Sequence, residues 1–128
     1  PALIQKVVDA KKNKKKFIKL WGNGQAKREL IFNEDIANAC VFFLNKKTKE
    51  TLINIGTGKD QKIIDYAKFV MKELNYKVKI KFDKSKPNGV PQKLLDISLA
   101  KKYGWRAKTD LKTGFWKTYH SFIKNIYN

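Results

Sequence analysis

The sequence predicts a mixed α/β (or α+β) fold, on three observations. Stretches in which apolar residues recur at helical spacing alternate along the chain with shorter stretches rich in β-forming residues. The apolar fraction of 42%, with 12% aromatic residues, is that of a globular protein. A length of 128 residues suits one modest hydrophobic core, so residues 1–128 are expected to form one domain or a piece of a larger protein.

Two helices are expected in the first third of the chain. Residues 1–12 open with Pro1, which suits a first turn. Their apolar face is formed by Leu3, Ile4, Val7 and Val8. In the second helix, Asn33 is expected to cap the N-terminus ahead of an acidic first turn. Its buried face is expected to contain Ile36, Cys40, Phe43 and Leu44. Cys40 is the sole cysteine, so no disulfide can form within the chain. Because it lies in the apolar stretch IANACVFF, it is interpreted as a residue packed in the core.

The remainder of the chain alternates between strands and helices. Strands are expected at 16–22, 51–58 and 77–83, and helices at 62–74, at 94–105 and after residue 110. In the strand at 77–83, lysines alternate with apolar residues, which predicts one basic face. Asp110 is expected to cap the last helix, whose buried face contains Leu111, Phe115, Tyr119, Phe122 and Ile126. His120 falls off that face and is expected to be exposed.

The net charge of +18 is the most unusual property of the composition. Of 29 basic residues only Arg28 and Arg106 are arginines, and the lysines are scattered among many Asn and Ile residues. Nucleic-acid readers usually rely on arginine for bidentate contacts. The cluster KKNKKK at 11–16 is interpreted as a solvated helix end and loop rather than as a nucleic-acid or membrane patch.

Catalytic and metal chemistry find little support in these residues. The chain has one His and one Cys, on separate predicted helices, which argues against a nucleophilic triad and against a metal site. The acids that follow Asn33 are interpreted as helix-dipole partners. The triplet at Gly56 to Gly58 follows a predicted strand, but the third glycine of a dinucleotide-binding fingerprint is missing. The residues alone therefore indicate a binding domain with no catalytic residue and no bound metal.

Several motifs resemble, in order and spacing, the C-terminal part of the GDP-L-fucose synthase family. These are WGNGQAKREL followed by IFNEDIANAC, then INIGTG, KFDKSKPNGVPQKLLD, YGW and TDLKTGFWKTYHSFI. The family belongs to the extended short-chain dehydrogenases/reductases and to the NAD-dependent epimerases/dehydratases. It uses NADPH to epimerise and reduce GDP-4-keto-6-deoxy-mannose. The resemblance covers essentially the whole chain, and the segment around SKP is its most specific part.

The resemblance implies that this chain is the smaller, substrate-binding lobe and lacks most of the Rossmann domain. In the family the NADP-binding loop and the catalytic residues precede the first residue of this chain, and Cys40 does not match the catalytic cysteine. NADP(H) is thus expected in the full-length enzyme, and none is expected to bind this chain alone. Full-length activity is expected to require the missing N-terminal lobe as a partner.

Five residues of this chain match substrate-binding positions by the same resemblance. Trp21 is implied to pack against the nucleotide sugar and Arg28 to meet its diphosphate, where a planar guanidinium bonds two oxygens in parallel. Lys6 stands where the family usually has an arginine, Lys93 matches a substrate lysine, and Lys79 is a weaker candidate. The alternatives are that Trp21 packs in the core and that Arg28 forms an ion pair with Glu29 or Glu34.

Two other functions stay open from the sequence. One is the lobe of another nucleotide-sugar epimerase or dehydratase that takes a UDP-sugar, and the other is a basic nucleic-acid-binding module. A cytoplasmic location, no membrane partner and no specific nucleic-acid partner are expected. The segment 51–58 would join the sheet of the missing lobe, so the chain alone is expected to self-associate.

Overall fold

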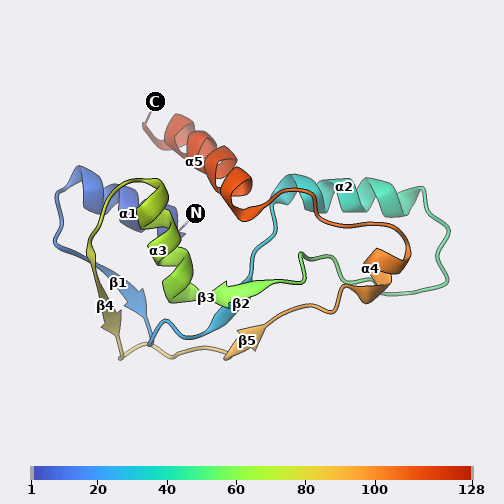
Figure 1. Ribbon diagram of the computed structural model, residues 1–128, viewed down its shortest axis with the longest axis horizontal. Coiled ribbons are helices and arrows are strands. Elements are labelled where there is room, and N and C mark those ends of the chain that lie inside the picture. The colour runs from blue at the N-terminus through green and yellow to red at the C-terminus, as the bar shows by residue number, and fades with distance from the viewer. Residues whose placement is uncertain (1, 128) are drawn as a thin grey trace. The chain divides into compact units, whose positions relative to one another are not determined.

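The computed structural model describes residues 2–127, with side chains up to Asn125, and it separates into two compact units. Unit 1 contains the residues up to 28 together with 61–93, and unit 2 contains 29–60 and the residues from 94 onward. Helices and strands are mixed along the chain, so the predicted fold class is confirmed (Figure 1). None of the helices within 2–127 is long and apolar enough to cross a membrane.

Ten helices and strands follow one another in the described part of the chain. They are α1 (Ala2–Lys12), β1 (Phe17–Trp21), β2 (Lys27–Glu29), α2 (Asn33–Leu44), β3 (Asp60–Lys62), α3 (Ile63–Glu73), β4 (Lys79–Asp83), β5 (Gln92–Lys93), α4 (Ser98–Lys102) and α5 (Leu111–Tyr127). Strands β1 and β4 form a two-stranded parallel sheet, and the other three strands form a second sheet in the order β3-β2-β5.

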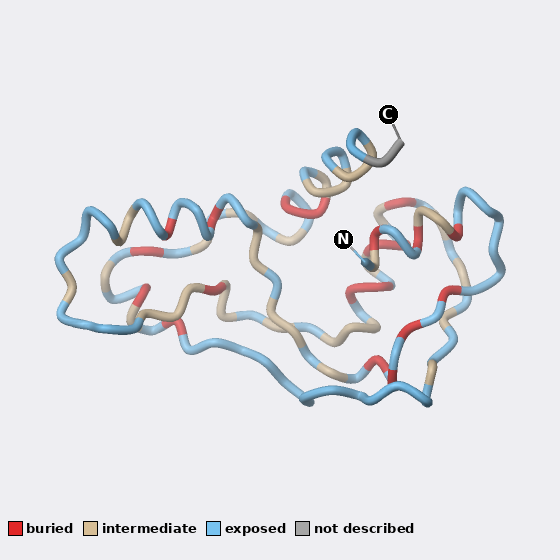
Figure 2. Tube along the Cα trace, turned by 180° about the vertical axis from the view of Figure 1, so that it is seen from behind, coloured by how far each residue is buried: buried red, intermediate tan, exposed pale blue. Residues whose placement is uncertain are grey.

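Unit 1 is built around the parallel pair β1–β4, with α3 between the two strands in the chain. A parallel pair needs such a crossover because a tight hairpin joins only antiparallel strands. Helix α1 packs against α3 and β1. Its buried residues are Ile4, Val7 and Ala10, those of β1 are Ile18 and Leu20, and those of α3 are Tyr66, Ala67, Val70 and Met71 (Figure 2). Pro1 lies outside the described residues.

Helices α1 and α3 end in the same type of cap and are joined by side chains at that end. Lys14 and Asn75 have positive φ, and the residue after each donates its N–H to a carbonyl five residues back. These are Schellman motifs, which pair carbonyls that a helix end leaves open. Tyr76 Oη lies 3.0 Å from the carbonyl oxygens of both Ala10 and Lys15. Lys11 Nζ donates to the carbonyl of Leu74, so the two helix ends are held together.

Unit 2 packs around Trp105. The ring is buried with Ala39 of α2 and Ala100 of α4, and partly buried apolar side chains surround the cluster. Trp105 Nε1 donates to Asn38 Oδ1 at 3.2 Å. The buried carboxylate of Asp35 accepts the backbone N–H groups of Lys108 and Thr109. Polar residues of α2 thus attach the helix to the segment that follows α4.

The predicted buried face of α2 is wrong except at Phe43, which packs on the Trp105 cluster. Ile36 is 43% exposed, Leu44 is 84% exposed, and Cys40 is exposed rather than packed in the core. The helix turns the side of Asp35 and Ala39 inward, because the amides of 108–109 and the Trp105 ring bind there. The predicted N-cap is also wrong, since Phe32 occupies that position and Asn33 is the first helical residue.

The predicted strand at 51–58 is absent from the described chain, where this segment is irregular. Ile53 and Ile55 pack on the Trp105 cluster, and the side chain of Asn54 donates to the carbonyl of Asp96. A strand requires a neighbour for its backbone groups, and this segment has none among residues 2–127. The helix predicted at 94–105 is shortened to α4, whose C-cap Tyr103 is followed by Gly104 with φ +93°, so the predicted stop at Gly104 is confirmed.

The N-terminus of α5 was predicted correctly. Asp110 Oδ1 accepts the N–H of Thr113 at 2.7 Å, which is the geometry of an N-cap. This hydrogen bond holds the pKa of Asp110 below its ordinary value. Phe115 is buried and His120 is exposed, as expected, while the side chain of Ile126 lies outside the described residues.

The carboxylate of Glu29 joins three segments of unit 2. Oε1 accepts the backbone N–H groups of Thr57 and Gly58, and Oε2 accepts that of Leu95 at 3.1 Å. A Cβ at Gly56 would lie 2.5 Å from Oε1, so only glycine allows the carboxylate to approach. Burial raises the pKa of Glu29, but the hydrogen bonds from Leu95, Gly58 and Thr57 outweigh it and hold the pKa below 4.5.

Because the pKa is lowered on folding, this network stabilises unit 2 above pH 4.5 and the stabilisation is lost as the pH falls through the folded-state value. We expect Glu29→Gln to cost about 2 kcal/mol at neutral pH, as loss of hydrogen bonds to a charged group does. The variant should also lose less stability than the unmodified chain on acidification. Urea unfolding at neutral and acidic pH measures both effects, and Glu50→Gln, at an exposed glutamate, is the matched control. Equal losses for the two variants would contradict this role.

Candidate substrate-binding site

The Trp-Gly-Asn-Gly stretch begins at Trp21, the last residue of β1, and forms a tight turn that needs both glycines. Gly22 and Gly24 have φ of +65° and +70°, where a side chain is strained. A Cβ at Gly22 would lie 2.6 Å from Asn88 Oδ1, and one at Gly24 would lie 2.7 Å from the ring of Phe82. The two glycines therefore allow the turn to lie close to Asn88 and Phe82 within unit 1.

This turn is bonded to the loop after β4. Gly22 donates its N–H to the carbonyl of Asp83 at 3.0 Å, and Asn23 donates its N–H to Asn88 Oδ1 at 2.9 Å. A hydrogen bond from the Ser85 hydroxyl lowers the pKa of Asp83, which keeps that end of the loop charged. Residues 84–93 are all exposed, and the segment runs in pale blue in Figure 2. The two loops thus form one bonded surface.

Trp21 lies at the edge of that surface and is 67% exposed, so the alternative of core packing is not observed. Its backbone precedes the Gly22 turn, and Lys86 Nζ lies 5.8 Å from its ring centroid. An exposed ring beside an ammonium group offers a flat apolar face and a positive charge to one ligand.

Arg28 is held against the same loop. Its Nη1 donates to the carbonyl oxygens of Lys27 at 2.6 Å and Val90 at 2.7 Å. A Cβ at Gly89 would lie 3.3 Å from Nη2, so the guanidinium lies against the Asn88–Val90 backbone. Nε and Nη2 have no hydrogen-bond partner in the described chain. That edge of a guanidinium is the one that binds two oxygens of a carboxylate or phosphate in parallel.

The alternative of an ion pair between Arg28 and Glu29 or Glu34 is not observed among the described side chains. Glu29 accepts backbone amides of unit 2, as described above. Glu34 pairs with Lys117 at 2.8 Å. The guanidinium is therefore positively charged without a carboxylate partner.

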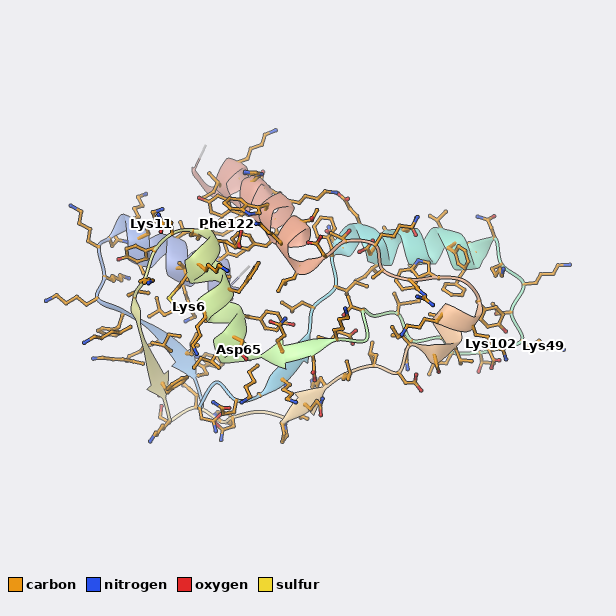
Figure 3. All side chains as sticks on the ribbon, in the orientation of Figure 1. Lys6, Lys11, Lys49, Asp65, Lys102 and Phe122 are labelled. Atoms are coloured by element: carbon orange, nitrogen blue, oxygen red, sulfur yellow. The ribbon has the colours of Figure 1, made fainter. Side chains whose placement is uncertain are left out.

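Lys93 is brought beside Arg28, whereas Lys79 and Lys6 are not. Arg28 and Lys93 are register partners in the parallel pair β2–β5, so both side chains lie on one face. Lys79 is the partner of Phe17 at the opposite end of the β1–β4 pair from Trp21, about 13 Å along the strand. Lys6 lies at an exposed position of α1, which packs on α3 and β1 (Figure 3).

The group that unit 1 assembles is thus Trp21, Arg28 and Lys93, together with Lys86 and Asn88, which the sequence analysis missed. Both missed residues belong to the SKPNG part of the sequence, and Asn-Gly is a common turn signal. That signal indicated a turn, but it could not show that the turn docks on residues 22–23, which are 65 positions away.

The loop at Gly56 to Gly58 does not fit a dinucleotide, and the described side chains form no metal cluster. The amides of Thr57 and Gly58 already donate to Glu29, so this glycine-containing loop has no such donors left for a pyrophosphate. Among residues 2–127 no three His, Cys, Asp or Glu side chains come together in a way that could hold a metal ion. The candidate site in unit 1 is a cationic and aromatic surface.

Known proteins resemble this chain along its whole length. The family model for the NAD dependent epimerase/dehydratase family matches residues 1–56. GDP-L-colitose synthase of Yersinia pseudotuberculosis is 40% identical over all of this chain and 42% of its own length. GDP-L-fucose synthase of Sinorhizobium fredii is 40% identical over 98% of this chain and 40% of its own length. The chain thus spans about two fifths of the curated relatives that it matches.

A solved structure shares the fold as well. MlghC, the GDP-mannoheptose C4 reductase from Campylobacter jejuni with NADP bound, matches with a TM-score of 0.74 at 27% identity, over 97% of this chain and 44% of its own. The resemblance predicted from the motifs is confirmed by these matches. The chain is similar over residues 1–56 to the NAD dependent epimerase/dehydratase family and, along its whole length, to a part of GDP-L-fucose synthase.

Proposed function

We propose that this chain is the C-terminal lobe of an NADPH-dependent GDP-L-fucose synthase and binds the GDP half of the substrate. The observation that carries the proposal is Arg28, whose Nη1 is fixed by two carbonyls while its Nε–Nη2 edge has no partner in the described chain. The loop that accepts from Arg28 also bonds the turn that follows the exposed Trp21. The names of the three similar proteins support a GDP-sugar, because each of them contains GDP.

The chemistry of the group matches a nucleoside diphosphate. Arg28 bonds two diphosphate oxygens, and Lys93, its register partner on β5, adds a second positive charge. Trp21 offers its ring to the base or sugar, with Lys86 near that ring. Lys6 and Lys79 stay predictions that rest on the resemblance alone.

The role of these residues is to bind and orient the sugar nucleotide. In the full-length enzyme NADPH supplies the hydride, and we place its site in the part of the protein outside this chain. Holding the diphosphate at Arg28 and the base at Trp21 limits the positions open to the sugar, which is how remote binding groups assist a reaction. The cytoplasmic location expected from the sequence is part of the same proposal.

Removing the Arg28 side chain tests the site. Arg28→Ala should weaken GDP binding by about 1.5–3 kcal/mol, because hydrogen bonds to a charged group are lost. Arg28→Lys should recover only part, since an ammonium group lacks the planar fork. Calorimetric titration with GDP measures the effect. Arg106→Ala removes the only other arginine and should leave affinity unchanged.

Two outcomes would overturn the assignment of this site. Unchanged GDP affinity in Arg28→Ala with a lowered melting temperature would show that Arg28 only holds the Val90 carbonyl. Tighter binding of UDP than of GDP by the unmodified chain would favour the lobe of a UDP-sugar epimerase or dehydratase.

The chain alone should be catalytically silent. His120 contacts the rings of Trp116 and Tyr119 on α5, Cys40 is exposed on α2, and both residues belong to unit 2. Purified chain is mixed with NADPH and GDP-4-keto-6-deoxy-mannose, and cofactor absorbance is followed. We expect no oxidation above a heat-denatured control. Turnover above that control would mean that these residues contain the catalytic groups.

The exposed apolar face of α2 supports the expected need for a partner lobe. Ile36, Val41 and Leu44 are 43%, 60% and 84% exposed, and residues 29–45 contain no Lys or Arg in a chain with 29 of them. We propose that the rest of the full-length protein covers this face and that the chain alone self-associates through it. Sedimentation should show concentration-dependent association that Val41→Lys with Leu44→Lys reduces. A clean monomer at high concentration would contradict it.

A further inference from the structure

A second surface of unit 1 collects lysines that lie outside the Arg28 group, among them Lys79, which only the resemblance assigns to the substrate. The turn after α1 and the segment before β4 line a shallow hollow, whose residues are Lys15, Lys16, Lys77, Val78 and Lys79. Figure 3 shows several long side chains with nitrogen ends projecting from this end of unit 1, around the α1–β1 loop. The solvated loop that the sequence suggested for 11–16 is therefore part of a shaped surface.

The hollow continues onto the outer face of the β1–β4 pair. The burial of β1 alternates, so Phe17, Lys19 and Trp21 point outward. In β4, Lys79 and Lys81 are exposed and stand opposite Phe17 and Lys19. We call the residues Lys15, Lys16, Phe17, Lys19, Lys77, Lys79 and Lys81 the lysine face.

The backbone beneath the lysine face is fixed. Lys14 holds its left-handed conformation within the helix cap, and Tyr76 Oη lies 3.0 Å from the carbonyl of Lys15. Lys79 donates its N–H to the carbonyl of Lys16 at 3.3 Å. The lysines therefore project from a bonded turn and a sheet, which lowers the entropy cost of binding to them.

The charges on this face are not balanced within the described chain. Lys15, Lys16, Lys77 and Lys79 form no ion pair with a described carboxylate. Asp83 is the only acid in β1 and β4, and it stands opposite Trp21. Beside the Ser85 hydrogen bond, the charge of Lys19 helps to lower the pKa of Asp83, and Lys19 is the one lysine of the face that does so. Lys19 and Lys81 are directly opposite each other, and facing like charges destabilise a strand pair. A bound polyanion would relieve that repulsion.

Aromatic rings alternate with these lysines. Phe17 is 37% exposed with Lys81 Nζ 4.0 Å from its ring centroid, and Trp21 follows about 13 Å further along the same face. Rings that stack bases and lysines that meet phosphates are the two components of single-strand binding. We propose that the lysine face binds single-stranded nucleic acid without sequence preference, a property that goes beyond the proposed GDP-sugar site and does not depend on it.

The test measures fluorescence anisotropy of a labelled oligodeoxythymidylate of about 15 nucleotides. Lys77→Gln with Lys81→Gln should weaken binding about tenfold and reduce the slope of log affinity against log salt by about 1.4, at about 0.7 for each of two phosphates on a single strand. Lys101→Gln with Lys102→Gln removes the same charge from α4 and should change affinity less than about twofold. Phe17→Leu should weaken binding about fivefold or more through lost stacking.

Several results would overturn the proposal. Equal losses in the two double variants would mean that net charge alone attracts the strand. A duplex of the same length that binds as tightly, or an unchanged affinity in Phe17→Leu, would exclude stacking. Loss of binding to phosphatidylserine vesicles in Lys77→Gln with Lys81→Gln, with oligonucleotide affinity retained, would point to a membrane instead. GDP titration of Lys77→Gln with Lys81→Gln separates the two sites. The GDP affinity of this variant should equal that of the unmodified chain, and if the proposed GDP site fails, neither protein binds GDP while the loss of oligonucleotide affinity still tests the lysine face.

Discussion

The carboxylate of Glu29 is the constraint on which the irregular part of unit 2 depends. Residues 51–59 form no strand in the described chain, so their backbone groups need other partners. Glu29 provides them by accepting the amides of Thr57, Gly58 and Leu95, and Gly56 allows the approach because it has no Cβ. The glycine-containing loop at 56–58 therefore binds the carboxylate of Glu29 with the amides that could have bound a phosphate. The dinucleotide interpretation of this loop thus fails on geometry as well as on glycine spacing.

In unit 1 the loops are held by hydrogen bonds to the backbone, whereas in unit 2 a carboxylate holds them. Backbone contacts position the side chains there, since the Gly22 turn and the guanidinium of Arg28 both bond to the loop after β4. One edge of Arg28 is used for structure and the other is open, so the same residue serves the fold and the proposed ligand. Trp21 and the lysine face share the outer side of β1, because alternate residues of a strand point the same way. The short strand β1 thus contributes Trp21 to the candidate substrate site and Phe17 and Lys19 to the lysine face.

The exposed surface of unit 1 is rich in lysine, whereas the exposed face of α2 in unit 2 is apolar. Lysines cover the sheet and helix ends of unit 1, where the Schellman caps turn the chain outward. The α2 face lacks basic residues and exposes Ile36 and Leu44. Exposed apolar surface is unfavourable in water and commonly marks an interaction site. Its presence on α2 agrees with the observation that this chain spans about two fifths of the length of its relatives.

The sequence by itself determined the elements whose causes are local. Helical periodicity, the Asp110 cap and the stop at Gly104 predicted α1, α3, the start of α5 and the end of α4, because these depend on residues within one or two turns. The resemblance of the motifs to the GDP-L-fucose synthase family implied Arg28 and Trp21 as candidate site residues. Only the tertiary structure decided which face of α2 is buried, that 51–58 forms no strand, and that Lys93 joins Arg28 while Lys79 lies elsewhere. Each of these depends on a partner tens of residues away, such as Trp105 for Ala39 or Glu29 for Gly58, and no local pattern encodes that distance.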